Sequence, residues 1–528
     1  MKNTFNSVKL QRFKSNFFDL SHDVKLTCKM GRLIPIMTME AVPGDTFQIK
    51  HQILARFQSV LAPIMHNIDI YHHTFFVPNR ILWPNWEKFM TPNVEGVVPN
   101  YPTINKIQGQ IGSLIDYFGF PVTSYDLPRI SALPFLAYNK IYNEYYRDQN
   151  LIDELPDEAL DGDNSAFRDW LVANPEPQFR AWRHDYFTAC LPWPQKGPTV
   201  LLPISGYSDV DVYMKDPLPI NTDTLAYQTI SGTTSILNNM TGLTSDALGR
   251  LRGKQGTTTT NFYIDPNGTL AARTSQLQTQ AATVNNLRQA FAIQQYYERA
   301  AVAGTRYTEY LSAFFGVRSQ DSRLQRPEYV CGGKQPMIIS EVIQTSKSEG
   351  DQPLGSLAGH GISAGGSNDR KFRVPEHGWI ITLMSVVPKA GYQDGIPKHY
   401  QRFDPLDYLN PMFARLGEQE VLNKEVFYSE DESYNEAIFG YIPRYSEYRF
   451  HSSRVAGDMR TNLDFYHMNR KFSNDNKPLL NKEFIDCRPT TRIFPVISED
   501  NRPLLAHIVN NVIVKRQLPK YGTPALIV

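Results

Sequence analysis

Basic and aromatic side chains interleave between residues 441 and 472, and their types suit one chemical task. The basic side chains that could contact phosphate are Arg444, Arg449, Arg454, Arg470 and Lys471, and nearby aromatic ones include Tyr445, Tyr448, Phe450 and Tyr466. Bases stack on such rings while guanidinium groups hold phosphates, so the pattern favours sequence-tolerant binding of single-stranded nucleic acid. Because Glu447, Asp458 and Asp464 dilute the positive charge, a tyrosine-rich strand with solvated charges and a contact between subunits also fit the pattern.

The N-terminal end of the chain, up to Lys14, forms a second candidate contact with nucleic acid. It contains Lys2, Lys9, Arg12 and Lys14 and no acidic residue. Four uncompensated charges suit a local contact with phosphate, even in a chain whose net charge is close to zero. Because strand-like patterning begins only beyond residues 16–22, we expect residues 1–30 to form an extended arm.

No catalytic or metal site can be assembled from the sequence. His72 and His73 are the nearest candidate ligands, but adjacent residues of a strand face opposite sides of a sheet. Residues 332–334, Gly-Gly-Lys, lack the leading glycine and the following Ser or Thr of a phosphate-binding loop, so we expect a turn there. No HExxH motif occurs. We therefore predict no enzymatic activity, no metal and no cofactor.

The elements that must carry these residues are expected to be strands. The 528 residues are 12% aromatic and include 36 prolines, which suits many short strands joined by ordered loops. The formal net charge is +1, so no global field attracts the whole chain to nucleic acid or to an anionic membrane. Any such contact must therefore be local.

Cysteine spacing and hydropathy indicate an intracellular, soluble protein. The four cysteines, Cys28, Cys190, Cys331 and Cys487, form no CxxC pair, so we expect free thiols in a reducing cytoplasm. The longest apolar stretch, residues 379–388, is about half the roughly 20 residues that cross a bilayer. The N-terminus has no apolar core like that of a signal peptide.

Strand-like segments lie towards both ends of the chain. Residues 32–57 and 66–77 are rich in Ile, Val, Thr, Phe and Tyr and are interrupted by turn residues at 43–45 and 63. Residues 372–387 have similar content. Near the C-terminus one set of side chains alternates with another, as in a half-buried strand: Ala506, Ile508, Val512 and Val514 against His507, Asn511 and Lys515.

Helices are expected in three short stretches. Residues 134–146 fit a helix within a long loop, and residues 287–300 have apolar side chains at spacings of three and four. Gly304 can provide the left-handed cap of the second helix. A third helix is predicted from Thr305, as N-cap, to Gly316.

Two further stretches have the composition of loops. Of residues 217–282, 34 are Ser, Thr, Asn, Gln or Gly and only seven are charged, so this insertion should cover surface without building much core. Five glycines after Gln352 predict a flexible loop: Gly355, Gly359, Gly361, Gly365 and Gly366. The absence of a fixed-period repeat argues against a solenoid or propeller.

Several long segments occur in an order that is specific to one family. They are FDLSHDVKLT (18–27), GRLIPI (31–36), PGDTF (43–47), TFFVPNRILWPNWEKFM (74–90), YNEYYRD (142–148), RHDYFTACLPWPQKG (183–197), LRQAFAIQQYYERAAVAGTRYTEYLSAFFGV (287–317), RLQRPEYVCGG (323–333) and VPEHG (374–378). Together they resemble the major capsid protein of microviruses, especially of the gokushovirus branch. The resemblance covers the chain nearly from end to end, and residues 217–282 depart from it most.

The resemblance implies an architecture and a set of partners. It implies a mainly β chain in which residues 31–528 form one eight-stranded antiparallel jelly roll with long loops. About 60 copies would close into a small T=1 icosahedral shell around a circular single-stranded DNA genome. Residues 217–282 would correspond to a variable insertion at the threefold axes and could contact a host surface receptor. Other phage structural proteins are further expected partners, with the chain made in the bacterial cytoplasm and residing in the virion.

One pairing and two alternatives complete the sequence-based expectations. Because such jelly rolls place their first and last strands side by side, residues 34–49 should pair in one sheet with residues 505–515. A receptor-binding spike would share the β content and a Thr-rich tip but remain a small oligomer. A carbohydrate-active β-sandwich enzyme would require a pair of carboxylates in one cleft.

Overall fold

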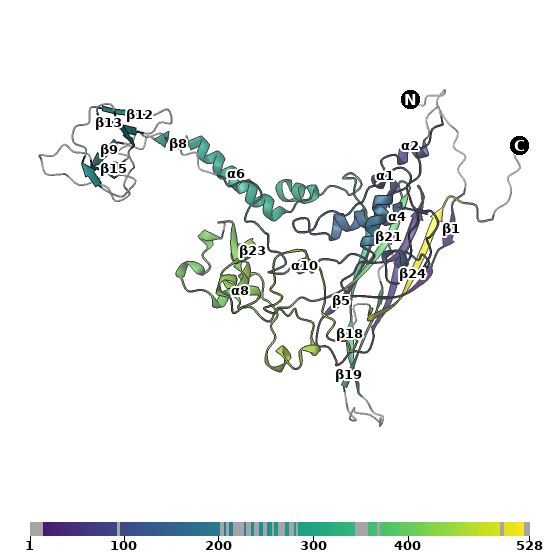
Figure 1. Cartoon of the computed structure of the whole chain (residues 1–528). Helices are drawn as coiled ribbons and strands as arrows, with labels where there is room; N and C mark the ends of the chain where they lie inside the picture. Colours follow the sequence, from purple (N-terminus) through teal and green to yellow (C-terminus); the bar gives the residue numbers. More distant parts are fainter. Residues whose placement is uncertain are drawn as a thin grey trace. The chain divides into compact units, whose positions relative to one another are not determined.

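The computed structural model divides the chain into two compact units, residues 1–196 with 297–528, and residues 197–296. The described residues are 14–91, 96–200, 284–343, 357–366, 370–414, 416–496 and 501–521, together with short strands between 205 and 280. The larger unit carries two antiparallel sheets and several short helices (Figure 1).

The larger sheet has seven strands, and its central strands β24 and β4 pair over almost their whole lengths. Its strands are β1 (Asn16–Asp19), β2 (His22–Cys28), β4 (Thr46–Phe57), β18 (Ile338–Ile343), β19 (Leu357–Gly366), β20 (Arg370–Arg373) and β24 (Leu504–Arg516). The order is β1-β24-β4-β19-β18, with β2 also on β24 and β20 also on β4. The first and last strands of the chain are therefore neighbours.

The smaller sheet contains strands from the middle of the chain. They are β3 (Ile34–Ala41), β5 (Ile68–Pro78), β17 (Glu328–Pro336) and β21 (Gly378–Pro388), in the order β17-β5-β21-β3. Figure 1 shows β5 and β21 running side by side. All these pairings are antiparallel.

The hydrophobic core lies between the two sheets. Alternate residues of β24 are buried, as predicted, and Val512 packs in one cluster with Phe47 of β4 and Phe76 of β5. A second cluster joins the sheets farther along through Ile508, Ile53 and Ile70, among others. Alternating strands with one apolar face thus form a two-layer sandwich, because each sheet buries its apolar face against the other.

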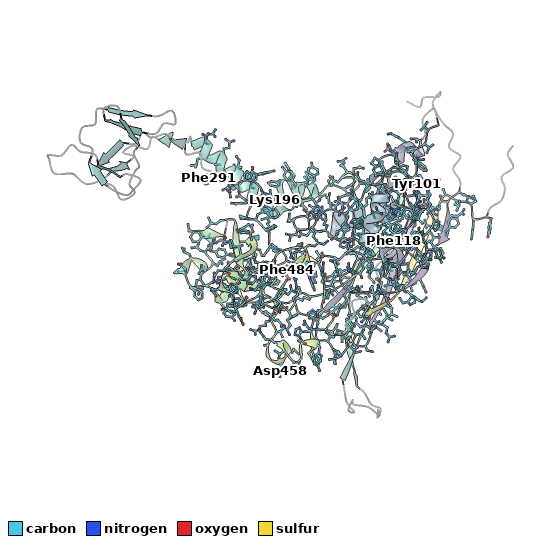
Figure 2. All side chains as sticks on the ribbon, in the orientation of Figure 1. Tyr101, Phe118, Lys196, Phe291, Asp458 and Phe484 are labelled. Carbon is cyan, nitrogen blue, oxygen red and sulfur yellow. The ribbon has the colours of Figure 1, made fainter. Side chains whose placement is uncertain are left out.

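A helical layer covers the other face of the smaller sheet. It contains α1 (Asn79–Leu82), α2 (Trp86–Met90), α3 (Leu114–Tyr117), α4 (Leu133–Ile141), the π-helix η1 (Tyr142–Tyr146) and α5 (Ser165–Ala173), with the strand pair β6 (Thr103–Ile104) and β7 (Ile130–Ser131). Helices α1 and α4 lie beside β21 (Figure 1). Residues of α4 pack against Phe75 and Leu383, and Tyr101 and Phe118 border the same cluster (Figure 2). The helix predicted at 134–146 is confirmed.

A separate core lies in the segment between β21 and β24. It involves β22 (Glu418–Leu422), β23 (Ile438–Pro443), α8 (Asn423–Val426), α9 (Glu432–Asn435) and α10 (Lys482–Ile485). Phe484, labelled in Figure 2, packs edge-on against Phe439 with 5.0 Å between ring centroids. Several one-turn 3-10 helices connect these elements, so this region is built mainly from ordered loops.

Helices follow the predicted insertion in the expected order. They are α6 (Val284–Ala303), α7 (Tyr307–Tyr310) and the π-helix η2 (Leu311–Phe315). Gly304 and Gly316 have φ of 95° and 68° and end the helices as predicted. The prediction of Thr305 as N-cap is wrong. The Thr305 hydroxyl donates to Asn150 Oδ1 at 3.0 Å. The N-cap of α7 is Arg306, whose backbone N–H donates to the Glu309 carboxylate at 3.1 Å.

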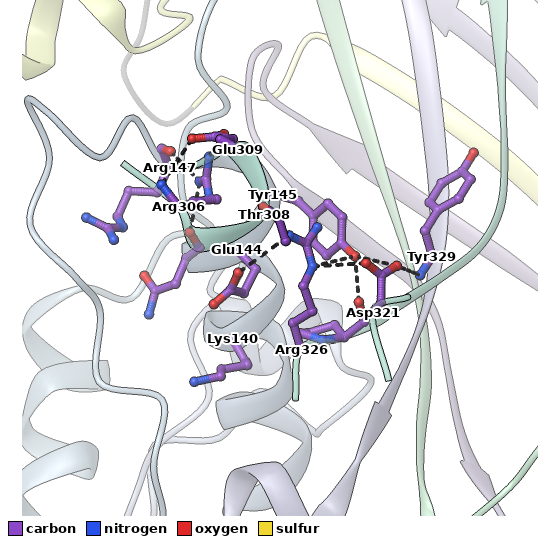
Figure 3. A network of polar contacts seen from close by, with 12 residues as sticks. Lys140, Glu144, Tyr145, Arg147, Arg306, Thr308, Glu309, Asp321, Arg326 and Tyr329 are labelled. Atoms are coloured by element: carbon purple, nitrogen blue, oxygen red, sulfur yellow. Dashed lines mark hydrogen bonds and ion pairs between the residues drawn. The ribbon is translucent and has the colours of Figure 1, made fainter. Parts of the chain in front are cut away.

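Charged side chains fasten this returning segment onto η1 (Figure 3). The Arg306 guanidinium donates to the carbonyl of Arg147 at 2.9 Å and pairs with Glu309 at 3.2 Å. The Arg326 guanidinium pairs with Asp321 at 3.2 Å and lies 4.4 Å above the ring of Tyr145. These contacts fix the chain where it returns to the larger unit.

The smaller unit, residues 197–296, contains short antiparallel strands. They are β8 (Ser205–Gly206), β9 (Asp211–Met214), β10 (Ala226–Gln228), β11 (Thr234–Ile236), β12 (Gly242–Ser245), β13 (Leu251–Gln255), β14 (Thr258–Asn261), β15 (Leu270–Arg273) and β16 (Thr279–Gln280). Pairing of β8 with β16 and of β9 with β15 brings the entering and leaving chain together. The rest of the predicted 217–282 loop lies outside the described residues.

The structure corrects the expected start of the sheet. Residues 16–28, expected as part of an arm, form β1 and β2 and pair with β24. The expected pairing of residues 34–49 with the last strand holds only from Thr46 onwards. Residues 34–41 are β3, which pairs with β21 in the other sheet, because the turn at 43–45 carries the chain from one sheet to the other.

Two glycine-rich stretches are strands instead of the predicted loop and turn. Residues 357–366 form β19, in which a Cβ on Gly361 would lie 2.5 Å from the Phe57 ring. Gly332 and Gly333 lie in β17, where a Cβ on either would meet His73 or His72. Glycine is used at these positions because neighbouring side chains pack against the backbone.

Candidate nucleic-acid interface

The basic side chains predicted between 441 and 472 do not form one field. The Arg470 guanidinium lies 3.9 Å above the Phe484 ring and close to three further aromatic rings, so it holds an aromatic cluster together. The Arg444 guanidinium lies 5.2 Å from the ring centroid of Tyr445 and is half-buried. The Lys471 ammonium pairs with Asp464 at 3.1 Å.

Only part of residues 441–472 is exposed to solvent, as binding of single-stranded nucleic acid would require. Arg449 and Arg454 are exposed, as are Tyr448 and Phe450. The segment consists of turns and the 3-10 helices η6 (Ser446–Tyr448), η7 (Gly457–Arg460) and η8 (Asp464–Tyr466), and β23 ends at Pro443. The alternative of a tyrosine-rich strand is therefore wrong beyond that point.

A basic face that the sequence did not reveal lies on the outward side of the larger sheet. It consists of Lys25, Lys50, Arg56, Lys371, Arg373 and Lys515 and is called the basic face below. Strand register brings three of these residues to one end of the face: Lys371 is opposite Gln48, and both Arg373 and Lys515 are opposite Thr46. Because the even-numbered residues of β4 point away from the core, their cross-strand partners do so too.

Few carboxylates oppose this charge. Among the described strands of the larger sheet, the acidic residues at outward positions are Asp19 and Asp23. Asp23 is shared between Lys25, at 3.9 Å, and His507, at 3.2 Å. Cations therefore outnumber carboxylates on this surface, whereas the charges of the chain as a whole are nearly balanced.

The basic face suits contact with phosphate more than with bases. Its exposed aromatic side chain, Phe17, is 68% exposed, and the Lys515 ammonium lies 5.9 Å from its ring centroid. One ring offers little stacking, whereas several lysines and arginines can follow a phosphate backbone without reading sequence. Lys14 is exposed and precedes β1 of the same sheet, while Lys2, Lys9 and Arg12 lie outside the described residues.

The two adjacent histidines face opposite sides of β5, as predicted. His72 points between the sheets, with its ring 5.6 Å from that of His51. His73 points to the helical layer, where its Nδ1 lies 2.8 Å from the Tyr146 hydroxyl. The described residues contain no group of three or more His, Cys, Asp or Glu side chains suited to hold a metal ion.

The thiols and the helices show two further features. All four cysteines are buried and unpaired, which confirms the prediction of free thiols. Burial raises the pKa of Cys28 to about 12. None of the described helices is long and apolar enough to cross a membrane.

Residues 4–526 match the sequence profile of a family described as capsid protein (F protein). The chain belongs to this capsid family. Curated relatives agree, each named capsid protein VP1. That of Chlamydia phage 1 is 34% identical over all of this chain and 98% of its own length. That of Bdellovibrio phage phiMH2K is 36% identical over 96% and 95% of the two chains, and that of Spiroplasma virus 4 is 31% identical over 97% and 96%.

Membership of the capsid family decides between the hypotheses drawn from the sequence. This capsid protein is a structural component of a virion and not an enzyme. Its antiparallel sheets agree with the predicted mainly β class. The alternatives of a spike protein and of a carbohydrate-active enzyme are set aside, because the match extends over nearly the whole chain.

Proposed function

We propose that this capsid protein is a jelly roll that builds a small T=1 shell of about 60 copies around circular single-stranded DNA. Strand order carries the proposal. Taking eight strands along the chain, one sheet has the order β2-β24-β4-β19 and the other β3-β21-β5-β17. In chain order the eight strands are β2, β3, β4, β5, β17, β19, β21 and β24. The first sheet thus contains strands one, eight, three and six, and the second contains strands two, seven, four and five. This is the arrangement of a double Greek key.

We further propose that the basic face contacts the genome inside the shell. A closed shell around DNA needs a surface that neutralises phosphate without selecting sequence, and clustered lysine and arginine side chains meet that need. The N-terminal arm, now taken as the residues before β1, would extend the same surface because it enters the same sheet. Arg449 and Arg454 remain the competing site.

Charge reversal distinguishes the two candidate interfaces. We expect Lys50→Glu with Lys371→Glu to lower nuclease-protected DNA per particle several-fold, because two phosphate contacts become repulsive. The matched variant Arg449→Glu with Arg454→Glu should leave packaging near the wild-type level. The measurement is the ratio of DNA to protein in purified particles. Unchanged packaging in the first variant, or a loss confined to the second, would overturn the assignment.

The N-terminal arm requires its own truncation. Deleting residues 2–13 removes Lys2, Lys9 and Arg12 but retains β1 and its pairing with β24. We expect less packaged DNA or less stable particles, because three phosphate contacts are lost. Particles with unchanged DNA content and unchanged thermal stability would show that the arm has no such role.

We also propose that the insertion recognises the host. Its polar composition needs little core, and paired entry strands hold its two ends together. Three copies gathered at a symmetry axis would strengthen weak binding to a surface receptor through avidity. A segment that only locks neighbouring subunits is the competing role. Other phage structural proteins would complete a virion assembled in the bacterial cytoplasm.

The strand pairs define where the insertion can be cut. Replacing residues 217–269 with a short Gly-Ser linker keeps β8 paired with β16 and β9 with β15. We expect intact particles that no longer adsorb to host cells. Assembly that fails would favour the locking role, and adsorption that is unaltered would refute recognition by this segment.

A further inference from the structure

Large apolar side chains are concentrated on one ordered loop between β21 and β22. Phe403 is 90% exposed and Met412 is 83% exposed. The other exposed members are Tyr400, Leu406, Tyr408, Leu409 and Leu416. We call residues 400–414 together with Leu416 the apolar loop. Seven large apolar side chains in so short a segment exceed the scattered exposure that is normal for a protein surface.

A buried ion pair fixes the base of the apolar loop. The Arg402 guanidinium pairs with Glu447 at 2.8 Å, and both side chains are less than a tenth exposed. It also lies 4.3 Å above the ring of Tyr448, while Gln419 donates to the second oxygen of Glu447 at 2.7 Å. The charge of the arginine is therefore neutralised within the protein.

Tyrosine hydroxyls hold the backbone of the same loop. The Tyr448 hydroxyl accepts from the N–H of Leu409 at 3.2 Å, and the Tyr445 hydroxyl accepts from that of Asn410 at 3.3 Å and donates to the Tyr408 carbonyl at 3.2 Å. Tyr445 has φ of 64°, a left-handed conformation that a bulky residue keeps only where the surrounding contacts hold it.

The loop is therefore preorganised, because Arg402 and several backbone groups are bonded within the protein, while the large apolar side chains are exposed. The 3-10 turns η3 (Lys398–Tyr400), η4 (Pro405–Asp407) and η5 (Pro411–Phe413) supply further backbone order. Asp404 caps η4 by accepting the N–H of Leu406 at 2.9 Å. A rigid apolar surface rich in Tyr, Phe and Met has the composition of the buried centre of a protein interface.

We propose that the apolar loop is a contact between copies of this chain, an inference that rests on the proposed shell. The charges described at the surface of the loop favour a protein partner over the genome. Asp404 and Asp407 are exposed, and Arg402 is neutralised by Glu447. Phosphate would be repelled there, whereas an apolar protein surface would cover the exposed rings. A second copy is the partner that every subunit of a shell must meet.

Paired substitutions test the contact. We expect Phe403→Ser with Met412→Ser to give a folded chain that forms at least tenfold fewer particles by sedimentation and electron microscopy. Tyr125→Ser with Val172→Ser is the matched control, because these side chains are 70% and 60% exposed but lie outside the loop. Circular dichroism checks that both variants fold. Normal assembly of the first variant, or an equal defect in the control, would overturn the proposal.

Thiol labelling supplies a readout independent of particle yield. A Met412→Cys variant introduces an exposed thiol into a chain whose four native cysteines are buried. Maleimide should label this cysteine at least tenfold more slowly in concentrated, assembled protein than in dilute subunits. Equal rates would refute the contact, and so would protection that requires another phage protein. Wild-type chains that associate without closing a shell would contradict the proposed function, while protection of the cysteine would still support the contact.

Discussion

Two histidine rings are buried in the core of the sandwich. His51 is held by Asn510, with 2.8 Å between His51 Nδ1 and Asn510 Oδ1, and by Thr74 at 3.2 Å. His72 is 1% exposed, and neither of its ring nitrogens has a hydrogen-bond partner in the part of the chain that the structure describes. Burial therefore lowers the pKa of His72 to about 4. The ring is uncharged at neutral pH, and its protonation destabilises the folded chain because it places an unpaired charge in the core.

We predict that acid destabilises the subunit partly through His72. Its pKa falls from about 6.5 in the unfolded chain to about 4 in the folded chain. The unfolded chain therefore binds the proton first, and the free energy of unfolding decreases as the pH falls from 6.5 to 4. Urea unfolding should show that the decrease in the free energy of unfolding between pH 6.5 and pH 4 is smaller by roughly 2–3 kcal/mol in His72→Leu than in the wild-type chain. An unchanged pH profile in the variant would contradict the assignment.

Single side chains set the limit of what the sequence could predict about the site. Arg470 has the residue type and neighbours of a phosphate ligand, yet its guanidinium stacks on Phe484 within the protein. Lys50 and Lys371 are far apart in the sequence and lie on the same face only because β20 pairs with β4. Local patterns therefore predicted basic residues in contact with aromatic rings but could not show which of them share a surface.

Strand elements were predictable where alternation or residue content was distinctive. β24 was recognised by its alternation, because one face of the strand is buried. β4, β5 and β21 were recognised by their β-branched and aromatic residues, and most of β21 is buried on both faces. β2 was missed because its pairing partner β24 lies near the opposite end of the chain and its apolar side chains are only half-buried. β19 was missed because its glycines resemble a loop, although they accommodate Phe57 and Gln335.

A pair of glycine substitutions tests the connection that leads into β3. Gly31 and Gly44 have φ of 77° and 90°, so alanine is strained at both positions by about 1–2 kcal/mol. A Cβ on Gly31 would also lie 1.8 Å from the carbonyl oxygen of Cys487, whereas Gly44 has nothing within 4 Å. We expect Gly44→Ala to lower the free energy of unfolding by that strain alone. Gly31→Ala should lower it substantially more, and equal losses in urea unfolding would contradict the packing described.

At the scale of the whole molecule, we propose that two chemically different surfaces divide the tasks of a capsid subunit. The basic face is a property of the larger sheet and suits phosphate. The apolar loop is ordered by a buried ion pair and by tyrosine hydroxyls, and it suits protein. On this proposal, a chain with nearly balanced total charge would bind DNA on one surface and its own copies on another.

Cryo-electron microscopy of particles purified from cells that express the chain tests the central claim most directly. The account predicts a closed icosahedral shell of about 60 copies, with the basic face towards the lumen and the apolar loop buried against a neighbouring copy. The DNA inside should lie closest to Lys50, Lys371 and the start of β1. Small open oligomers, or a closed shell with the basic face outside and the apolar loop exposed, would contradict it.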